Sequence, residues 1–68
     1  METIENSVQK LRTKAKVTQE QLADAVGVTR QTIIAIEKGS YIPSLLLALK
    51  IAQYFKKPVE SIFDVCKK

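Results

Sequence analysis

The chain has 68 residues, of which 46% are hydrophobic and 26% charged, and it carries a net charge of +4. This length allows one small core, and the composition is that of a folded domain and not of a disordered tail. The positive charge favours an anionic partner such as nucleic acid. One cysteine excludes an internal disulfide or a zinc site, the lack of histidine removes the commonest general base, and two glycines exclude a glycine-rich phosphate loop, so we expect neither an enzyme nor a cofactor.

The first apolar pattern lies near the N-terminus, where Ile4, Val8, Leu11 and Ala15 recur at helical spacing. These residues fall on one stripe of a helix that Thr3 would cap. We therefore expect a first helix that follows Thr3.

The second helix has a stronger start signal. The sequence TQEQ at 18–21 has the form of a capping box, and Val17 and Leu22 are spaced to make a hydrophobic staple around it. Gly27 ends the pattern at a point where a left-handed residue would reverse the chain. We expect the second helix between Thr18 and Gly27.

The same signals recur for a third helix. Thr29 is placed to cap it, Ile33 lies at the stapling position, and Gly39 would stop it. Ile33 and Ile36 would face inward, and Lys38 would complement the negative end of the helix dipole.

A fourth helix would begin after Pro43 and Ser44, and Pro58 would open a short fifth helix. The stripe expected to face the core in the fourth helix consists of Leu45, Ala48, Leu49, Ala52 and Phe55. The residues expected to close the core from the fifth helix are Val59, Ile62 and Phe63. No run alternates with period two over a useful length, so the prediction is an all-α, five-helix fold in a single domain over residues 1–68.

The second and third helices are each under three turns and are joined by the tight Gly27-Val28 connection, so they must pack at a steep angle. This arrangement predicts a helix-turn-helix over about residues 18–39. With Ile33 and Ile36 held in the core, the first turn of the third helix would project from the domain.

Two side chains in that turn suit the reading of base edges. Arg30 can donate two hydrogen bonds to guanine O6 and N7, and Gln31 can pair with adenine N6 and N7. Thr32 would meet a thymine methyl group or a phosphate, and Ala35 is small enough to let the helix seat deeply. Taken alone, the polar stretch 29–32 is more often a capped, solvated first turn.

The stretch TQEQLADAVGVTRQTIIAIEKGSYIPSLLLALKIAQYF at 18–55, followed by VESIF, resembles the phage-repressor-like helix-turn-helix family, also called the Cro-type or XRE family. The resemblance covers almost the whole chain. It implies a five-helix, lambda-repressor-like domain that binds double-stranded DNA as a homodimer on a symmetric operator, with the third helix in the major groove.

The resemblance also assigns DNA contacts to matching positions of this sequence. The base contacts would come from Arg30, Gln31, Thr32 and Ala35. The phosphate contacts would come from Gln19, Thr29, Lys38, Ser40 and Tyr41. Tyr41 is equally consistent with a half-buried anchor of its loop.

Arg12 and Glu37 resemble a family pair that ties the first helix to the end of the third. We expect a partly buried ion pair with a structural role, where two solvated surface charges are the alternative.

Three positions depart from the family's pattern. Ile34 and Leu46 stand where relatives commonly carry Ser or Glu, which would expose two apolar side chains, and Lys56 replaces a glycine that often follows the fourth helix.

A homodimer is expected because one recognition helix reads too few base pairs to select an operator. The favoured dimer surface is the C-terminal segment with Ile62, Asp64, Val65 and Cys66. The alternative is the apolar face of the fourth helix at Leu46.

The function predicted from the sequence is therefore sequence-specific DNA binding by a prokaryotic or phage transcriptional regulator, with repression as the commoner family outcome. The alternative is a protein-interaction module, such as an antitoxin or anti-repressor, that uses the face of the third and fourth helices. No leader and no apolar run near ~18 residues occur, so we expect a cytoplasmic protein without membrane contact. Control would then come from protein abundance, a separate regulatory protein or competition for DNA.

Overall fold

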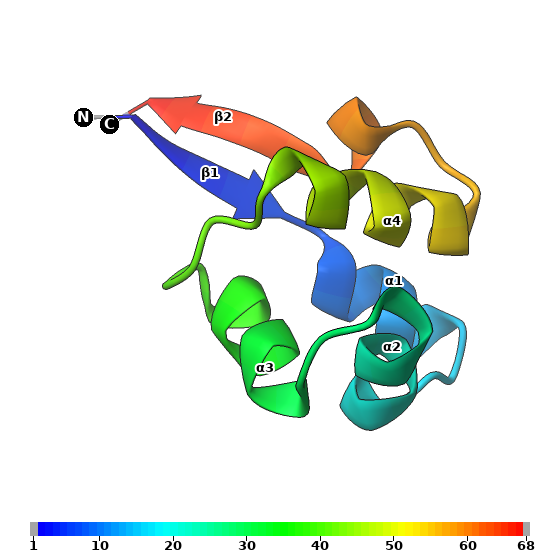
Figure 1. The fold of residues 1–68 in the computed structure, drawn as a ribbon. Coiled ribbons are helices and arrows are strands. Elements are labelled where there is room, and N and C mark those ends of the chain that lie inside the picture. The colour runs from blue at the N-terminus through cyan, green and yellow to red at the C-terminus, as the bar shows by residue number, and fades with distance from the viewer. Residues whose placement is uncertain (1, 68) are drawn as a thin grey trace.

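A computed structural model describes the backbone of residues 2–67 and the side chains of residues 4–65. The elements in chain order are β1 (Glu2–Asn6), α1 (Val8–Lys14), α2 (Gln19–Val26), α3 (Arg30–Lys38), α4 (Leu45–Phe55), the 3-10 turn η1 (Val59–Ser61) and β2 (Phe63–Lys67). Figure 1 shows the helices gathered around one core, with the two strands extending from it side by side. Within residues 2–67 the fold thus has four α-helices and one two-stranded sheet, and the expectation of an all-α, five-helix fold is wrong in these two respects.

The first expected helix is replaced in its first half by a strand. β1 pairs with β2 in antiparallel register, which places Ile4 opposite Val65 and Asn6 opposite Phe63. The spacing of Ile4 and Val8 is therefore not a helical repeat. No short window reveals this pairing, because the hydrogen-bonding partner of β1 lies about 60 residues away along the chain.

Asn6 fixes the point where α1 begins. Its Oδ1 accepts a hydrogen bond from the Val8 amide at 3.1 Å, and its Nδ2 donates to the Ile36 carbonyl of α3 at 2.9 Å. The Ser7 amide donates to the Ile62 carbonyl at 3.0 Å. These bonds satisfy polar groups at the junction and anchor the start of α1 to α3 and to the C-terminal segment.

The start and stop signals of the two central helices are confirmed. Thr18 Oγ1 accepts from the Gln21 amide at 3.0 Å, and Gln21 Oε1 accepts from the Thr18 amide at 2.8 Å, which completes the capping box before α2. Thr29 caps α3 by accepting from the Thr32 amide. Gly27 and Gly39 follow the two helices at φ values of 79° and 80°, as left-handed C-terminal caps.

The core receives side chains from every helix and from the segment after η1. Its buried residues are Val8, Leu22, Ala23, Val26, Ile33, Ile36, Leu47, Ile51, Ala52 and Ile62. Ile62 closes this core as expected, with Val59 and Phe63 half-buried against it. The fifth helix itself is reduced to the three residues of η1.

The face that α4 turns to the core differs from the one predicted. Leu47 and Ile51 are buried, while Leu45 and Leu49 of the predicted stripe are exposed. Nearly every position from 45 to 52 is apolar, so the hydrophobic period does not select one face of this helix. After α4, Lys56 adopts a left-handed conformation with φ 56°, which keeps the turn in the absence of a glycine.

Candidate nucleic-acid interface

The helix-turn-helix places the start of α3 at the surface. α2 and α3 pack against each other, and Ile33 and Ile36 are completely buried, so one side of α3 is fixed to the core (Figure 1). Arg30 and Gln31, in the first turn, are exposed. Neither side chain makes a hydrogen bond to another described residue, so both are available to a ligand.

The other residues predicted near this turn are less open. Thr29 Oγ1 lies 3.2 Å from Thr32 Oγ1 and also caps α3, so these two hydroxyls bind each other. Thr32 and Ala35 are half-buried. The predicted DNA contacts in this part of α3 thus fall into two groups. Arg30 and Gln31 are long side chains without a hydrogen-bond partner among the described residues, and three short residues lie beside them.

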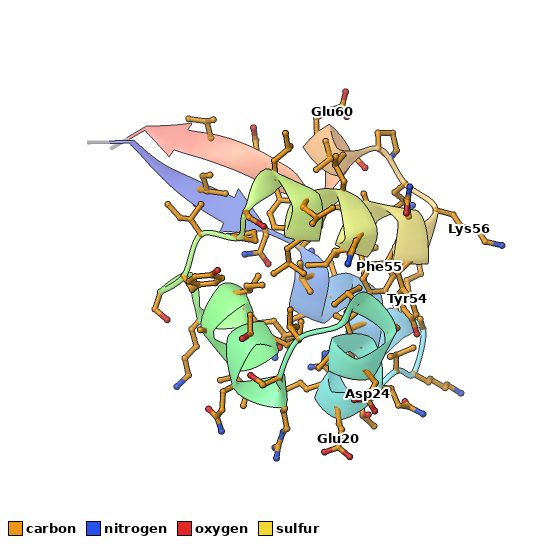
Figure 2. The ribbon with its side chains drawn as sticks, in the orientation of Figure 1. Glu20, Asp24, Tyr54, Phe55, Lys56 and Glu60 are labelled. Carbon is orange, nitrogen blue, oxygen red and sulfur yellow. The ribbon has the colours of Figure 1, made fainter. Side chains whose placement is uncertain are left out.

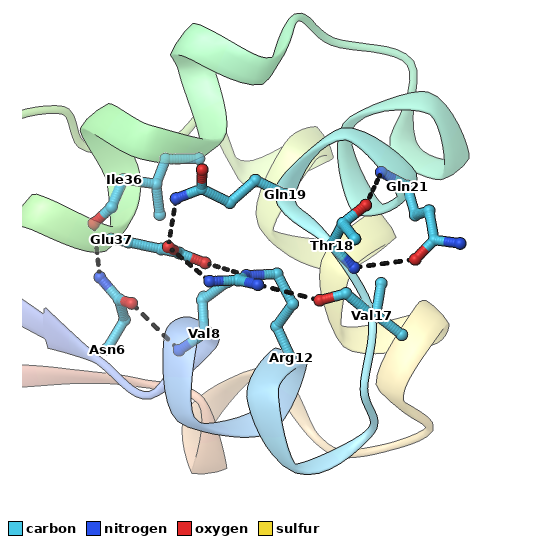
Figure 3. Close-up of polar contacts among 9 residues, drawn as sticks. All are labelled: Asn6, Val8, Arg12, Val17, Thr18, Gln19, Gln21, Ile36 and Glu37. Atoms are coloured by element: carbon cyan, nitrogen blue, oxygen red, sulfur yellow. Dashed lines mark hydrogen bonds and ion pairs between the residues drawn. The ribbon is translucent and has the colours of Figure 1, made fainter.

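Arg12, Gln19 and Glu37 form one polar cluster behind the start of α2 (Figure 3). Arg12 Nε donates to Glu37 Oε2 at 2.7 Å and Arg12 Nη2 donates to Oε1 at 3.3 Å, and the side chains are 13% and 4% exposed. Arg12 Nη1 also donates to the Val17 carbonyl at 2.9 Å. Gln19 Nε2 donates to Glu37 Oε1 at 3.0 Å. The cluster joins α1, the turn before α2, α2 itself and the end of α3.

The hydrogen bond from Gln19 to Glu37 is a contact that the sequence did not indicate. A carboxylate only accepts hydrogen bonds, so the amide nitrogen of Gln19 must face it. That nitrogen has a second hydrogen, which remains for another acceptor. Glu37 thus fixes the orientation of a side chain that was predicted to contact phosphate.

A shallow hollow of about 690 Å³ lies next to this cluster. Its lining consists of Arg12, Thr13, Lys16, Val17, Thr18, Gln19, Glu20 and Arg30. Arg12 is neutralised by Glu37, so the remaining charges are the cations of Lys16 and Arg30 and the carboxylate of Glu20. Figure 2 shows Glu20 and Asp24 pointing outward from α2. The hollow therefore keeps a net positive charge and brings Gln19 and Arg30 to one surface.

Lys16 is a residue of this hollow that sequence reasoning missed. It stands in the turn between α1 and α2 at φ 60°, a conformation that glycine adopts more easily. No sequence motif marks the exposed Lys16 in this turn. Its left-handed conformation is visible only in the structure, so the one signal in the sequence is a basic residue two positions before the capping Thr18.

The residues after α3 have mixed surroundings. Lys38 is exposed, and Ser40 Oγ donates to the Ala35 carbonyl at 3.3 Å. Tyr41 is 46% exposed and lines a second hollow with Thr32 and Leu46. These three residues follow or end α3, and none of them lines the hollow at Gln19.

The predicted dimer residues do not form one exposed surface. Ile62 is 2% exposed and belongs to the core, so it offers almost no area to a partner. Asp64 and Val65 are exposed on β2, and the side chain of Cys66 lies outside the described residues. On the alternative surface, Leu46 is exposed as expected, whereas Ile34 is half-buried.

Two classes of site find no support in the described part of the chain. Among residues 4–65, whose side chains the structure describes, no group of histidine, cysteine or acidic residues is arranged to hold a metal ion. None of the helices there has the length and apolar character needed to cross a bilayer.

Comparison with known proteins gives consistent matches. The helix-turn-helix family profile matches residues 8–62. The HTH-type transcriptional regulator YgzD of Bacillus subtilis is 53% identical over 60 residues, which are 88% of this chain and 91% of the relative. The CTXphi transcriptional repressor RstR of Vibrio cholerae is 30% identical over 57 residues, which are 84% of this chain and 51% of RstR.

Solved structures with the same fold include the restriction-modification controller protein C.AhdI from Aeromonas hydrophila. That structure has a TM-score of 0.73 and 30% identity, with 78% of this chain and 80% of the other covered. A putative DNA-binding protein from Bacteroides fragilis reaches a TM-score of 0.81 with 19% identity, covering 91% of this chain and all of the other, and this likeness concerns the fold alone.

Proposed function

The chain belongs to the helix-turn-helix family of transcriptional regulators, and from this premise we propose that it binds double-stranded DNA sequence-specifically, as a homodimer, with α3 in the major groove. The observation that carries this proposal is that the side chains of Arg30 and Gln31 are exposed and free of hydrogen bonds to described residues. Both extend from the first turn of a helix whose opposite side is locked in the core, and neither is engaged by a described residue. The whole chain would act as one DNA-binding domain.

Base reading is assigned to the exposed first turn of α3. The guanidinium of Arg30 has the fork geometry for guanine O6 and N7, and the amide of Gln31 matches adenine N6 and N7. Ala35 lies one turn beyond Gln31 and leaves room for a base edge or a thymine methyl group. Thr32 would contribute its methyl group, because its hydroxyl is close to Thr29.

Phosphate binding is assigned to residues at the start of α2 and to residues at the end of α3. Gln19, at the start of α2, would donate its second amide hydrogen to a phosphate, and the cation of Lys16 in the same hollow would support it. Lys38 would contact the backbone beyond α3. Thr29, Ser40 and Tyr41 stand beside these groups as weaker contacts. Such contacts fix register and carry no base information.

Binding of this kind acts on transcription by occupancy of a promoter. Repression is the proposed outcome, supported by the similarity to a protein named as a phage transcriptional repressor. The family is a class of transcriptional regulators and not of enzymes, and catalysis forms no part of the proposal. The chemistry required is hydrogen bonding and charge neutralisation alone.

Selection of bound sites from a random duplex library tests the proposal. The expected result is an enriched motif with two-fold symmetry and half-sites about one helical turn apart. Affinity for that motif should fall steeply with salt, because phosphate contacts release counterions. If no sequence is enriched and binding responds little to salt, the protein-interaction role becomes the better account of the exposed surface.

A further inference from the structure

The side of α4 that faces away from the core carries large aliphatic residues. Ile42, in the loop before α4, is 62% exposed, and Leu45, Leu46 and Leu49 are 72, 65 and 43% exposed. Leu45 and Leu49 are four residues apart on the helix, and Leu46 and Leu49 are three apart, so the three leucines are neighbours. We refer to Ile42, Leu45, Leu46 and Leu49 as the α4 surface.

The α4 surface is large for a molecule of this size. Side chains exposed to this degree present on the order of 500 Å² of apolar area, in the upper part of the roughly 300–600 Å² that the largest patch on a monomer reaches. A standard interface buries about 800 Å² on each partner. The α4 surface supplies more than half of that area.

The charge of this region identifies the kind of partner. Residues 40–49 are ten consecutive positions without a charged side chain, in a chain of which 26% is charged. In a two-fold contact the same patch is used by both copies, so a charge near the axis would meet a like charge. The four residues of the α4 surface carry no charge and complement a second copy of themselves, while Lys50, one turn beyond Leu46, stands at the margin of the patch.

The C-terminal sheet has the opposite property. Glu5 and Asp64 lie directly opposite each other on β1 and β2, and Glu60 lines the same hollow as both. Two copies joined through this face would bring carboxylates together. Val65 and its partner Ile4 lie on the other face of this sheet, where Val65 is exposed and Ile4 is half-buried, and Ile62 is in the core, so that face offers less exposed apolar area than α4. Charge and burial therefore favour α4 over the C-terminal segment as a contact with a second copy.

The position of the α4 surface in the chain suits a DNA-bound dimer. α3 ends at Lys38 and α4 begins at Leu45, so only a short loop separates the two helices. None of the four residues of the α4 surface lines the hollow that contains Gln19 and Arg30. Contact through the α4 surface would leave that hollow open and would hold two copies of α3 at a fixed separation.

We propose that the α4 surface is the homodimer contact of this protein, which sets the spacing between the two recognition helices. The proposal rests on the proposed function for its role in DNA binding, but the contact itself is testable without DNA. The occupant is a second copy of this chain.

Sedimentation equilibrium without DNA is the first test. The wild type is expected to be dimeric at micromolar concentration, and Leu45→Glu and Leu49→Glu should each raise the dimer dissociation constant at least tenfold. Ala25→Glu is the matched control, because Ala25 is an exposed apolar residue of α2 outside the α4 surface, and it should stay within about twofold of the wild type. Circular dichroism melts establish that each variant is folded.

A proximity test complements the loss of affinity. In a Cys66→Ser background, Leu45→Cys should form an intermolecular disulfide under mild oxidation, whereas Ala25→Cys on α2 should form several-fold less. A wild type that is monomeric both alone and on its selected site would overturn the proposal. So would a folded Leu45→Glu protein that remains fully dimeric, or a Val65→Glu protein that becomes monomeric while Leu45→Glu stays dimeric.

DNA binding by the variants separates this inference from the proposed function. On a duplex with one half-site, Leu45→Glu should bind within a few-fold of Ala25→Glu, and on the full site it should lose cooperativity. If Leu45→Glu dissociates the dimer but no variant binds DNA, the contact stands and the proposed function fails. If the wild type selects a site but keeps its dimer in Leu45→Glu, the proposed function stands and the contact fails.

Discussion

Glu37, near the end of α3, holds Arg12 of α1 and Gln19 of α2 at the same carboxylate, with donor–acceptor distances of 2.7 Å to Arg12 Nε and 3.0 Å to Gln19 Nε2. One buried acidic side chain therefore connects the scaffold of the domain to a predicted phosphate contact. The orientation of α3 and the orientation of the Gln19 amide depend on the same group. This dependence gives the ion pair a measurable role beyond stability.

The first prediction concerns this pair. Arg12→Met should lower the free energy of unfolding by about 3 kcal/mol, because it leaves the Glu37 carboxylate, which is 4% exposed, without its main counter-charge. Urea denaturation measures the loss. The double variant Arg12→Met/Glu37→Leu should lose less than the sum of the two single losses, since the second change removes the unpaired charge. Additive losses would show that the two side chains do not act as a pair.

The second prediction separates base reading from phosphate binding. Arg30→Ala should cost about 1–3 kcal/mol on the selected site and should relax preference at one base position. Gln19→Ala should weaken all sequences by a similar factor and leave the selected motif unchanged. Binding to a panel of sites with single base changes measures both effects. A uniform loss in Arg30→Ala would assign Arg30 to the phosphate backbone.

The helices of this fold were predictable wherever their end signals are local. Thr18 and Thr29 cap their helices and Gly27 and Gly39 end them, and each of these roles depends on residues within four positions. For the same reason the exposed turn with Arg30 followed from sequence.

The remaining features depend on contacts between distant segments. The pairing of β1 with β2 joins the two ends of the chain, and the inner face of α4 is chosen by its neighbours because the helix is apolar on most sides. The bond between Gln19 and Glu37 spans 18 residues. Neither periodicity nor a capping motif reports such contacts.

The third prediction tests the junction that sequence reasoning missed. Asn6→Ala should lower the free energy of unfolding by about 1–3 kcal/mol, because it removes a bond to the Val8 amide and one to the Ile36 carbonyl in a partly buried site. Chemical denaturation measures the loss, with the exposed Gln53→Ala variant as the control. Asn6→Asp should recover part of the loss through the bond to Val8. An unchanged midpoint in Asn6→Ala would mean that these bonds contribute nothing net.

The last prediction uses two lysines that share one backbone conformation. Lys16 and Lys56 have φ values of 60° and 56°, so glycine at either position relieves left-handed strain. The relief exceeds the entropic cost of glycine, and each variant should gain about 0.5–1 kcal/mol in unfolding free energy. Both substitutions remove one positive charge. They differ in place, because Lys16 lines the hollow with Gln19 and Arg30 whereas Lys56 projects beyond the end of α4 (Figure 2).

DNA affinity should therefore separate the two lysine variants while thermal stability does not. Lys16→Gly should weaken binding to all sequences and reduce the slope of log affinity against log salt by about 1, as expected for one lost phosphate contact. Lys56→Gly should keep both the affinity and the slope of the wild type, since its charge lies away from the proposed DNA surface. Thermal melts and salt titrations of the two variants measure the four quantities. Equal affinity losses would assign the effect of Lys16 to net charge, and no loss in either would remove Lys16 from the interface.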